Sequence, residues 1–490
     1  MSTIPLAAAD TLVRLDDALA LTGARGRSVA GRGIDVVDPA TGAVLTTLPG
    51  DDADDARRAA DAAAAALPGW AATPPRTRSE ILATAHRLML DRADGLTALV
   101  SWESGKSRAD ARAEITYAAE FLRWFAEEAV RPEGHFGTAP DGLSTTVVTA
   151  QPVGVAALVT PWNFPAAMVT RKIAPALAAG CTAVLKPAAE TPLTALAIEG
   201  LLGEAGVPDG VLQVVVTSAA GPVVATLLDH PAVRKLSFTG STGVGRLLLR
   251  HAADRVVNCS MELGGNAPFV VCADADIESA VVGAVAAKLR NAGQACTAAN
   301  RFLVHADVAD EFTDALVREF DALSVGPPSD PATDLGPLID RRAVERIQER
   351  VDDVLERGAV LANRPVPVPQ AGSYLAPMIL RDVPEDSALV VKETFGPVAP
   401  IVTWREPDDI VRLANSTEYG LAGYVFSGDT AQALRLGRAM RCGMVGINRG
   451  VVSDPAAPFG GMRQSGLGRE GARDGIRAFQ ESQFLSVAGL

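Results

Sequence analysis

Cysteine and histidine are both scarce in this sequence, with five of each among 490 residues. The cysteines are scattered and odd in number, so they do not suggest a disulfide framework, and this usage is typical of a reducing cytoplasm. None of the histidines stands in a spacing typical of a metal site or a catalytic triad. We therefore expect neither structural disulfides nor a bound metal.

Positive charge and long apolar runs are lacking as well. The formal net charge of -13 provides no basic field for a nucleic acid, and an anionic substrate would need a local cluster of cations. No apolar run reaches the roughly 20 residues of a membrane-spanning helix. The first segment, Met1–Gly23, carries charged residues among its apolar positions, which is unlike a signal peptide. We expect a cytoplasmic protein that binds neither nucleic acid nor membrane.

What the sequence does contain is a regular alternation of strand-like and helix-like segments. The chain exceeds the size of a single core, so two or three structural units are expected. The first 130 residues have mostly helical spacing. From residue 153, short apolar runs alternate with helical segments, which is typical of an open parallel sheet covered on both faces. The expected strands of this first set are 155–160, 182–186, 211–216, 235–240 and 256–260.

A second α/β set starts at residues 267–271 and continues to about residue 460. The β-branched run 144–149 favours a strand that follows a loop and forms an arm, and 482–486 is another expected strand. The predicted fold class is therefore α/β, with two doubly wound open-sheet domains and a small β arm.

Two short segments combine a carboxylate and a thiol with small residues. Glu262 is followed by Leu263-Gly-Gly265, and Cys296 ends the segment Asn291-Ala-Gly-Gln-Ala-Cys296. A thiol can attack a carbonyl carbon, and a nearby carboxylate can then deprotonate water. On local chemistry alone, Cys296 could equally be a small buried residue and Glu262 a surface carboxylate. Because no histidine stands beside Cys296, a papain-like hydrolase is disfavoured.

Three expected strands end in residues suited to a ligand, since open α/β sheets bind ligands beyond the carboxyl ends of their strands. Asn163 follows the first and could donate to an oxyanion, or could be a turn residue between two prolines. Lys186 ends the second and could reach a ribose or phosphate, or simply be solvated. Ser241 opens a small-residue turn before a helix, which suits a diphosphate but also an ordinary N-cap.

Two further strings match nucleotide-binding patterns by chance. Gly466–Gly471 satisfies G-x-G-x-x-G, but no strand precedes it and too little chain follows for a βαβ unit. Gly105-Lys106-Ser107 resembles the end of a phosphate loop, but Val100 occupies the position of the first glycine. We expect neither string to bind a nucleotide.

In chain order, these segments resemble the aldehyde dehydrogenase superfamily over nearly the whole sequence. The motifs that carry the resemblance are Pro161-Trp-Asn-Phe-Pro165, Lys186-Pro187, Phe238-Thr-Gly-Ser-Thr242, Glu262-Leu-Gly-Gly265, Gly293-Gln-Ala-Cys296, Glu393-Thr-Phe-Gly-Pro397 and Pro458-Phe-Gly-Gly461. The resemblance implies that Cys296 is the nucleophile, that Glu262 is the general base, and that Asn163 and the Cys296 N–H form the oxyanion hole. It also implies a thiohemiacetal and then a thioester on the cysteine, which water hydrolyses.

The resemblance further implies a nicotinamide dinucleotide cofactor. The residues expected to hold it are Thr160, Trp162, Lys186, Ala189, Gly240, Ser241, Glu393 and Phe395. NAD-specific relatives carry a glutamate at the position of Ala189, where it bonds the adenine ribose. Its absence predicts that NADP is accepted and preferred, unless Glu190 reaches the ribose and favours NAD.

Within the superfamily, residues 162–171, 264–268, 288–294 and 458–471 look like succinate-semialdehyde dehydrogenase. There, residues matching Arg171, Arg290 and Ser453 grip the distal carboxylate of the substrate, and a guanidinium fork suits a carboxylate. Either arginine could instead form a structural salt bridge. The expected reaction is the NAD(P)-dependent oxidation of succinic semialdehyde to succinate. The alternatives are a dehydrogenase of another carboxylated or broad-range aldehyde, such as glutarate semialdehyde, and a cofactor-independent thiol esterase.

By the same resemblance, residues 1–130 and 150–259 form a dinucleotide-binding domain, and 260–460 form a catalytic domain. Residues 131–149 and 475–490 form a bridging arm. Exposed strands in such an arm favour pairing with another subunit, so we expect a homodimer or homotetramer. Ala298 stands where many succinate-semialdehyde enzymes have a second cysteine, so no local disulfide switch is expected beside Cys296.

Overall fold

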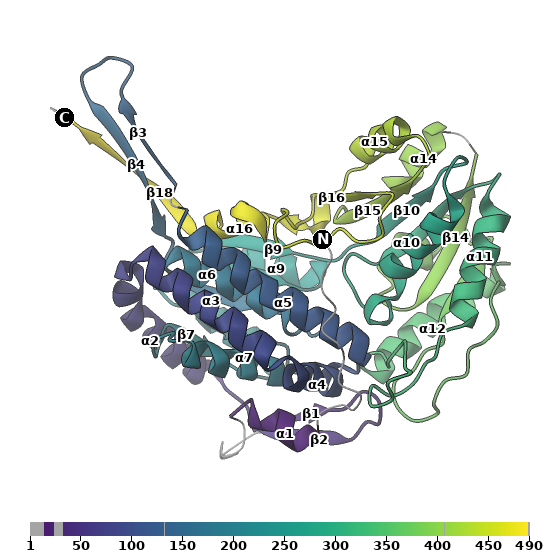
Figure 1. Cartoon of the computed structure of the whole chain (residues 1–490), viewed down its shortest axis with the longest axis horizontal. Coiled ribbons are helices and arrows are strands. Elements are labelled where there is room, and N and C mark those ends of the chain that lie inside the picture. Colours follow the sequence, from purple (N-terminus) through teal and green to yellow (C-terminus); the bar gives the residue numbers. More distant parts are fainter. Residues whose placement is uncertain (1–13, 24–32, 132, 406, 489–490) are drawn as a thin grey trace.

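Two open sheets and a projecting arm make up the molecule (Figure 1). The computed structural model describes residues 14–23, 33–131, 133–405 and 407–488. Within these residues, every helix is too short or too polar to cross a membrane. The predicted fold class, α/β with two doubly wound sheets, is confirmed.

The first sheet has six strands in the order β17-β9-β8-β5-β6-β7, parallel except for β17. Its strands are β5 (Val155–Val159), β6 (Thr182–Lys186), β7 (Leu212–Val214), β8 (Val233–Thr239), β9 (Asn258–Glu262) and β17 (Gly466–Leu467). Every residue of β5 and β6 is buried, as expected for parallel strands covered on both faces. The order runs outward in both directions from β5, so the sheet is doubly wound.

Helices cover both faces of this sheet. The connecting helices are α6 (Ala167–Ala179), α7 (Leu193–Glu204), α8 (Ala220–Asp229) and α9 (Thr242–Ala253). The helices before them are α1 (Leu15–Ala20), α2 (Ala53–Ala72), α3 (Pro75–Asp91), α4 (Ala93–Ser104) and α5 (Arg108–Ala129). Ala156 and Leu158 pack in one core with α3, α5 and α6, while Val155 and Ala157 pack in another with α2 and α8. Alternate residues of one strand thus serve the two faces.

The second sheet has seven strands in the order β12-β13-β14-β11-β10-β15-β16, parallel except between β12 and β13. Its strands are β10 (Ala267–Val271), β11 (Ala299–His305), β12 (Val360–Leu361), β13 (Met378–Arg381), β14 (Val398–Trp404), β15 (Ala422–Phe426) and β16 (Met444–Ile447). The helices of this part are α10 (Ile277–Leu289), α11 (Ala309–Asp321), α12 (Arg341–Glu356), α13 (Ala388–Val391), α14 (Pro407–Ala414) and α15 (Thr430–Ala439). Two short 3₁₀ turns, η1 (Arg290–Gly293) and η2 (Arg463–Ser465), lie in its loops.

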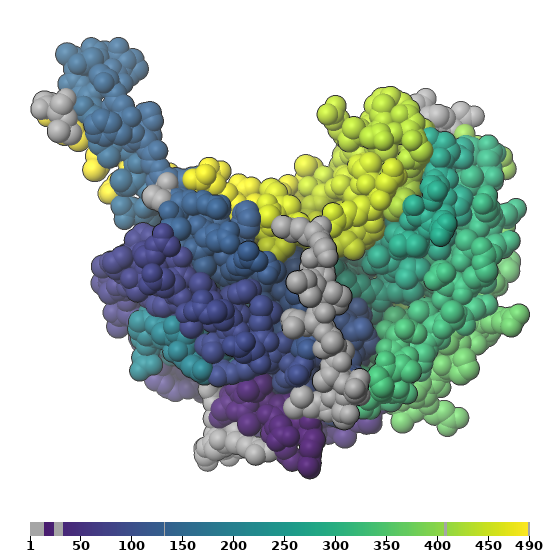
Figure 2. Space-filling view, viewed as in Figure 1, coloured from purple at the N-terminus to yellow at the C-terminus, as the bar shows by residue number. Residues whose placement is uncertain are grey.

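The arm is an antiparallel sheet of β3 (Gly134–Thr138), β4 (Thr145–Pro152) and β18 (Gln480–Val487), with β4 in the middle. The short helix α16 (Ala472–Arg477) leads into β18. Figure 2 shows the arm standing away from the body of the molecule. Phe136, Leu143 and Phe484 on the arm are 73%, 77% and 60% exposed, which is unusual for large apolar side chains.

The predicted strands agree with the structure to within three residues at each end, because buried parallel strands give short apolar runs between turns. The antiparallel pair β1 (Gly33–Val37) and β2 (Val44–Pro49) was not predicted, since its short alternation lies within a mostly helical region. The proposed boundary at residue 260 falls inside β9, and the chain passes to the second sheet through residues 263–266. The functional division into domains stays a prediction.

Candidate active site

Glu262 ends β9, and the two glycines after Leu263 let three segments approach one another. A Cβ atom on Gly265 would lie 2.2 Å from the carbonyl oxygen of Cys296. A Cβ atom on Gly264 would lie 2.8 Å from a carboxylate oxygen of Glu393. The first contact is with backbone and requires glycine at position 265, whereas the second would displace the end of the Glu393 side chain. The small residues seen in the sequence therefore place Glu262, Cys296 and Glu393 around one point.

The Glu262 carboxylate is buried, and neither of its oxygens has a hydrogen-bond partner within the described structure. Burial raises its pKa well above the usual value, and the nearby carboxylate of Glu470 raises it further. Lys172 and Arg171 act in the opposite direction. A buried carboxyl group with a raised pKa and free oxygens is suited to exchange protons with water.

Cys296 lies in a turn between η1 and β11 and is only partly exposed. Burial raises the pKa of its thiol to about 12, and Glu393 and Glu262 also raise it. The positive charges of Arg171 and Arg290 lower it. Both arginines that the sequence predicted therefore lie within electrostatic reach of this thiol.

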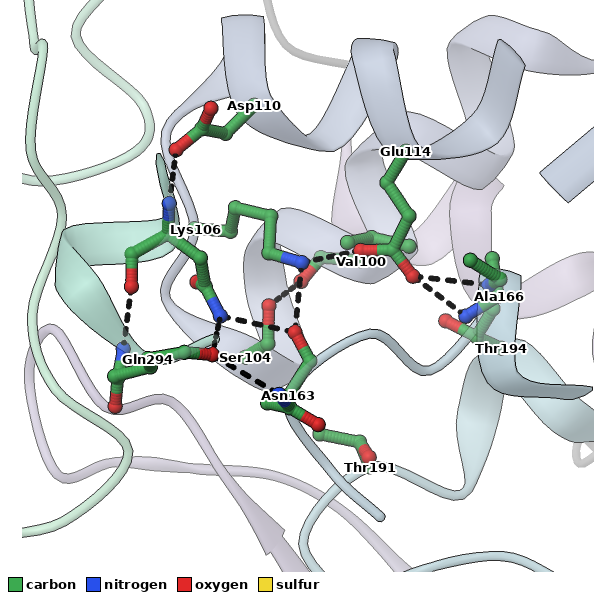
Figure 3. A network of polar contacts seen from close by, with 12 residues as sticks. Val100, Ser104, Lys106, Asp110, Glu114, Asn163, Ala166, Thr191, Thr194 and Gln294 are labelled. Atoms are coloured by element: carbon green, nitrogen blue, oxygen red, sulfur yellow. Dashed lines mark hydrogen bonds and ion pairs between the residues drawn. The ribbon is translucent and has the colours of Figure 1, made fainter. Parts of the chain in front are cut away.

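Asn163 lies in the loop between β5 and α6 and reaches the cysteine loop. Its side-chain Nδ2 donates to the carbonyl of Gln294 at 3.0 Å, two residues before Cys296 (Figure 3). Its own carbonyl accepts hydrogen bonds from Lys106 Nζ and Asn291 Nδ2, each at 2.9 Å. Asn163 is thus more than a turn residue, because its amide is aimed at the segment that carries the thiol.

Arg171 is almost fully buried on α6 among aromatic rings. Its guanidinium carbon lies 4.0 Å from the ring centroid of Phe459, and Nη2 donates to the Tyr117 hydroxyl at 2.6 Å. Its Nη1 is 3.9 Å from Glu470, a loose ion pair, and its Nε has no partner within the described structure. A donor left over at this depth is suited to a ligand carboxylate.

Arg290 lies in η1, with its guanidinium carbon 5.0 Å from the ring centroid of Phe164 and Nη2 3.5 Å from Thr297 Oγ1. No ion pair to Arg290 occurs among the described side chains, which argues against a purely structural salt bridge. Ser453 is half-buried in the loop after β16, and the described contacts do not place it against either arginine. The structure thus brings Arg171 and Arg290 to the thiol and leaves Ser453 as a prediction.

The ends of β5, β6 and β8 carry polar groups that fit a dinucleotide. Thr160 Oγ1 and Thr239 Oγ1, at the ends of β5 and β8, are buried without a partner in the described chain. Lys186 ends β6 and is mostly buried, which lowers its pKa, while the nearby Glu190 acts to raise it. Ser241 caps α9 through its Oγ, which accepts from the Val244 N–H at 3.4 Å. The Ser241 turn is therefore an N-cap that could also bind a diphosphate, because an N-cap leaves other N–H groups of the first turn free.

Ala189 and Gly240 are partly exposed beside these groups. On the side of the second sheet, Glu393 accepts a hydrogen bond from the Gly265 N–H at 2.9 Å, and burial raises its pKa to about 7. The rings of Phe395 and Trp162 meet edge to face with centroids 5.5 Å apart. Residues far apart in sequence thus line one edge, where a dinucleotide could lie between the two sheets.

Sequence reasoning missed four residues that contact these groups. Lys172 Nζ donates to Glu470 at 2.5 Å and to Ser237 at 2.9 Å, and Lys106 pairs with Glu114. Glu470 stands inside the rejected string Gly466–Gly471, whose first two residues, Gly466 and Leu467, pair as β17 with β9. Lys106 stands inside the rejected phosphate-loop string. Both strings carry a buried charge near the site.

Comparison with known proteins accounts for this geometry. Residues 27–485 match the model of the aldehyde dehydrogenase family. The chain belongs to this family. A succinate-semialdehyde dehydrogenase of Paenarthrobacter nicotinovorans is 49% identical over 445 residues, which cover 91% of this chain and 99% of the relative. A glutarate-semialdehyde dehydrogenase of Pseudomonas putida is 45% identical over 460 residues, covering 94% of this chain and 95% of the relative.

The crystal structure of an E. coli NADP-dependent enzyme has the same fold, with a TM-score of 0.92 and 46% identity. It covers 94% of this chain and 95% of the other. The predicted superfamily and its relationship to succinate-semialdehyde dehydrogenases are thus confirmed, and the chain is an aldehyde dehydrogenase. The roles of individual residues in this aldehyde dehydrogenase remain predictions.

Proposed function

We propose that this aldehyde dehydrogenase oxidises succinic semialdehyde to succinate with NADP. The observation that carries the proposal is the pair of arginines, Arg171 and Arg290, within electrostatic reach of the Cys296 thiol. In a chain of net charge -13, two cations beside one thiol form the local cluster that an anionic substrate needs. The relative from Paenarthrobacter nicotinovorans acts on succinate semialdehyde, as its name states.

In the proposed mechanism, the Cys296 thiol gives its proton to solvent water and its sulfur adds to the aldehyde carbon. The Asn163 amide and the Cys296 N–H donate to the oxyanion that forms. When bound, the nicotinamide dinucleotide supplies the acceptor for the hydride that leaves this carbon. The carbon remains on the sulfur as a thioester. Glu262 then takes a proton from a water molecule, the resulting hydroxide attacks the thioester, and the acid departs as the thiolate is restored.

Arg171 supports the choice of a carboxylated aldehyde. Its guanidinium is held by the ring of Phe459 and the hydroxyl of Tyr117, so its orientation is set before a substrate arrives. Its unpartnered Nε is a donor for the distal carboxylate. Glutarate semialdehyde, with one more methylene, is the second candidate, because the Pseudomonas putida relative is named for it.

Ala189 and Lys186 support the preference for NADP. The position of Ala189 offers no carboxylate to repel a 2′-phosphate, and Lys186 supplies a cation at the same strand end. Glu190 is exposed and lies near Lys186, where it would favour NAD if it reached the ribose. The related E. coli structure is that of an NADP-dependent enzyme.

The arm supports assembly into a homodimer or homotetramer. β3 and β18 form the two edges of its sheet, and exposed edges with large apolar side chains favour pairing with a second copy. A groove of about 640 Å³ at its base, lined by β3, β4, Arg473 and Arg477, provides a further concave surface.

The substrate is tested by comparing Arg171→Met with the wild-type chain, using succinic semialdehyde and an uncharged aldehyde of similar length, each with NAD and NADP. We expect kcat/KM for succinic semialdehyde to fall about 100-fold, as a buried charged hydrogen bond is lost. The uncharged aldehyde should lose much less, because it is affected only by the smaller thiolate fraction of Cys296. Arg246→Met, at an exposed arginine on α9, is the control. Equal losses on both aldehydes would contradict the clamp, and release of product without absorbance at 340 nm would favour a thiol esterase.

A further inference from the structure

A buried ion pair lies directly behind Asn163 and takes no part in the chemistry proposed above. Lys106, in the link between α4 and α5, pairs with Glu114 of α5, and neither side chain is exposed (Figure 3). A buried ion pair is weak support for stability, because desolvation of the two charges cancels much of their attraction. The role of this ion pair is therefore inferred from the other contacts of the two side chains.

Lys106 holds the main chain of the oxyanion loop. Its Nζ donates to the carbonyl of Asn163 at 2.9 Å and lies 4.0 Å from the ring centroid of Phe164. An ammonium group at this distance is attracted to both the carbonyl and the ring face. Two consecutive residues of the loop between β5 and α6 are thus fixed by one cation.

Glu114 holds the start of α6. The helix has no side-chain cap of its own, and its first N–H groups need acceptors. Glu114 accepts hydrogen bonds from the N–H groups of Ala166 at 2.8 Å and Ala167 at 3.2 Å. A carboxylate at a helix N-terminus is also favoured by the helix dipole. The helix fixed in this way carries Arg171.

The same segment reaches the cysteine loop. Asp110, in the first turn of α5, accepts a hydrogen bond from the Asn291 N–H at 2.7 Å. Asn291 has a φ of +54° and donates in turn to the Asn163 carbonyl at 2.9 Å. Residues 106–114 therefore contact both loops that are proposed to form the oxyanion hole, one from each sheet.

We infer that Lys106 and Glu114 are positioning residues, which hold the Asn163 amide and the start of α6 in register with the Cys296 loop. Both side chains are fully buried, and they act through the main chain of Asn163 and the start of α6. The inference rests on the proposed role of Asn163 as an oxyanion donor. A misplacement of about 1 Å at such a donor can cost about 100-fold in rate, so loss of the pair should lower kcat.

The test uses the double variant Lys106→Met with Glu114→Gln, which removes both charges together and avoids leaving one buried charge alone. We expect kcat and the initial burst of absorbance at 340 nm to fall about 10- to 100-fold, with the KM for NADP within about twofold. With an uncharged aldehyde, for which Arg171 is not needed, the same double substitution in an Asn163→Ala background should cost less than about twofold, since no amide remains to be positioned. Lys106→Met with Glu114→Met gives the same comparison if the first pair does not fold.

Glu103→Gln is the matched control. Glu103 is also a fully buried glutamate, and it caps α7 by accepting from the Leu193 and Thr194 N–H groups at 2.7 and 3.0 Å. We expect it to lower the thermal midpoint and leave kcat unchanged. Equal losses of kcat in this control and the double variant would show a merely structural role and overturn the inference.

The failures of the two proposals are separable. Wild-type kcat in Asn163→Ala would overturn the proposed role of Asn163 and this inference with it. A slow Asn163→Ala beside a double variant of wild-type rate would overturn the inference alone. Equal costs of the double substitution with and without Asn163 would do the same.

Discussion

The Cys296 thiol has a pKa well above that of a free cysteine. Burial raises its pKa to about 12, while Arg171 and Arg290 lower it. At neutral pH only a small fraction is therefore thiolate, the form that attacks carbonyls and alkylating reagents. The arginines thus serve two purposes in the proposed site, since they attract the substrate and also favour the reactive form of the nucleophile.

This predicts how alkylation of Cys296 by iodoacetamide depends on pH. Below the pKa, the thiolate fraction rises tenfold for each pH unit, so the rate should rise about tenfold per unit from pH 6 to pH 9 without levelling off. Arg171→Met removes a charge that lowers the pKa, so its rate should be smaller at every pH. Mass spectrometry of the labelled peptide follows the reaction, with Cys296→Ser to account for the half-exposed Cys259. A plateau below pH 8 would contradict the raised pKa.

At the scale of elements, the site depends on loops that approach one another so closely that no side chain fits between them. The turn after β9 meets the loop before β11 at Gly265, where a Cβ atom would lie 2.2 Å from the Cys296 carbonyl oxygen. Gly293, whose φ is +76°, meets the carbonyl of Gly396 in a similar way. The contact at Gly265 lies between the two sheets, and the contact at Gly293 joins two loops of the second sheet.

Gly265→Ala is therefore expected to displace the cysteine loop. We expect kcat/KM to fall more than about 100-fold, because the thiol moves relative to Asn163, and the free energy of unfolding to fall by about 1–3 kcal/mol from overpacking. Gly221→Ala is the control, since a Cβ atom on this residue of α8 meets no atom of the described residues within 4 Å. Steady-state kinetics and urea unfolding measure both effects. Wild-type activity in Gly265→Ala would show that the loop can yield without consequence.

At the scale of the whole molecule, the arm is a part of the single chain that leaves large apolar side chains exposed. Phe136 on β3 and Phe484 on β18 are exposed, although both strands pair with β4 along their whole length. Substituting them should not disturb the fold of one chain. Any change in mass or stability would therefore report on contacts between chains.

We predict that Phe136→Ser with Phe484→Ser lowers the assembly state. The two residues are 73% and 60% exposed, so their loss should shift the mass measured by light scattering toward the monomer and make the thermal midpoint depend less on concentration. Val360→Ser, at a 53% exposed valine on the opposite edge strand β12, serves as the control. An unchanged mass in the arm variant would contradict pairing through the arm.

The sequence predicted the two sheets and the reactive pair, but not the groups that hold them. Strands such as β6 could be predicted because their buried residues form a continuous apolar run between turns. Cys296 and Glu262 could be found because their motifs are local. The contact between Lys172 and Glu470 joins residues 298 positions apart, and that between Lys106 and Asn163 spans 57. No local pattern indicates such partners. The strings that contain Lys106 and Glu470 were considered only as nucleotide-binding motifs, so the buried charges in them were missed.

The route of the last residues has a consequence for the order of events during synthesis. Gly466 and Leu467 complete the edge of the first sheet by pairing with Glu262 and Met261, Glu470 joins the surroundings of the proposed base, and β18 completes the arm. A ribosome-bound chain that has emerged only as far as residue 460 can build most of both cores. It would still hold its proposed base on the open edge of the first sheet, where β9 pairs with β8 alone. Activity should therefore appear late in translation, after the scaffold has folded.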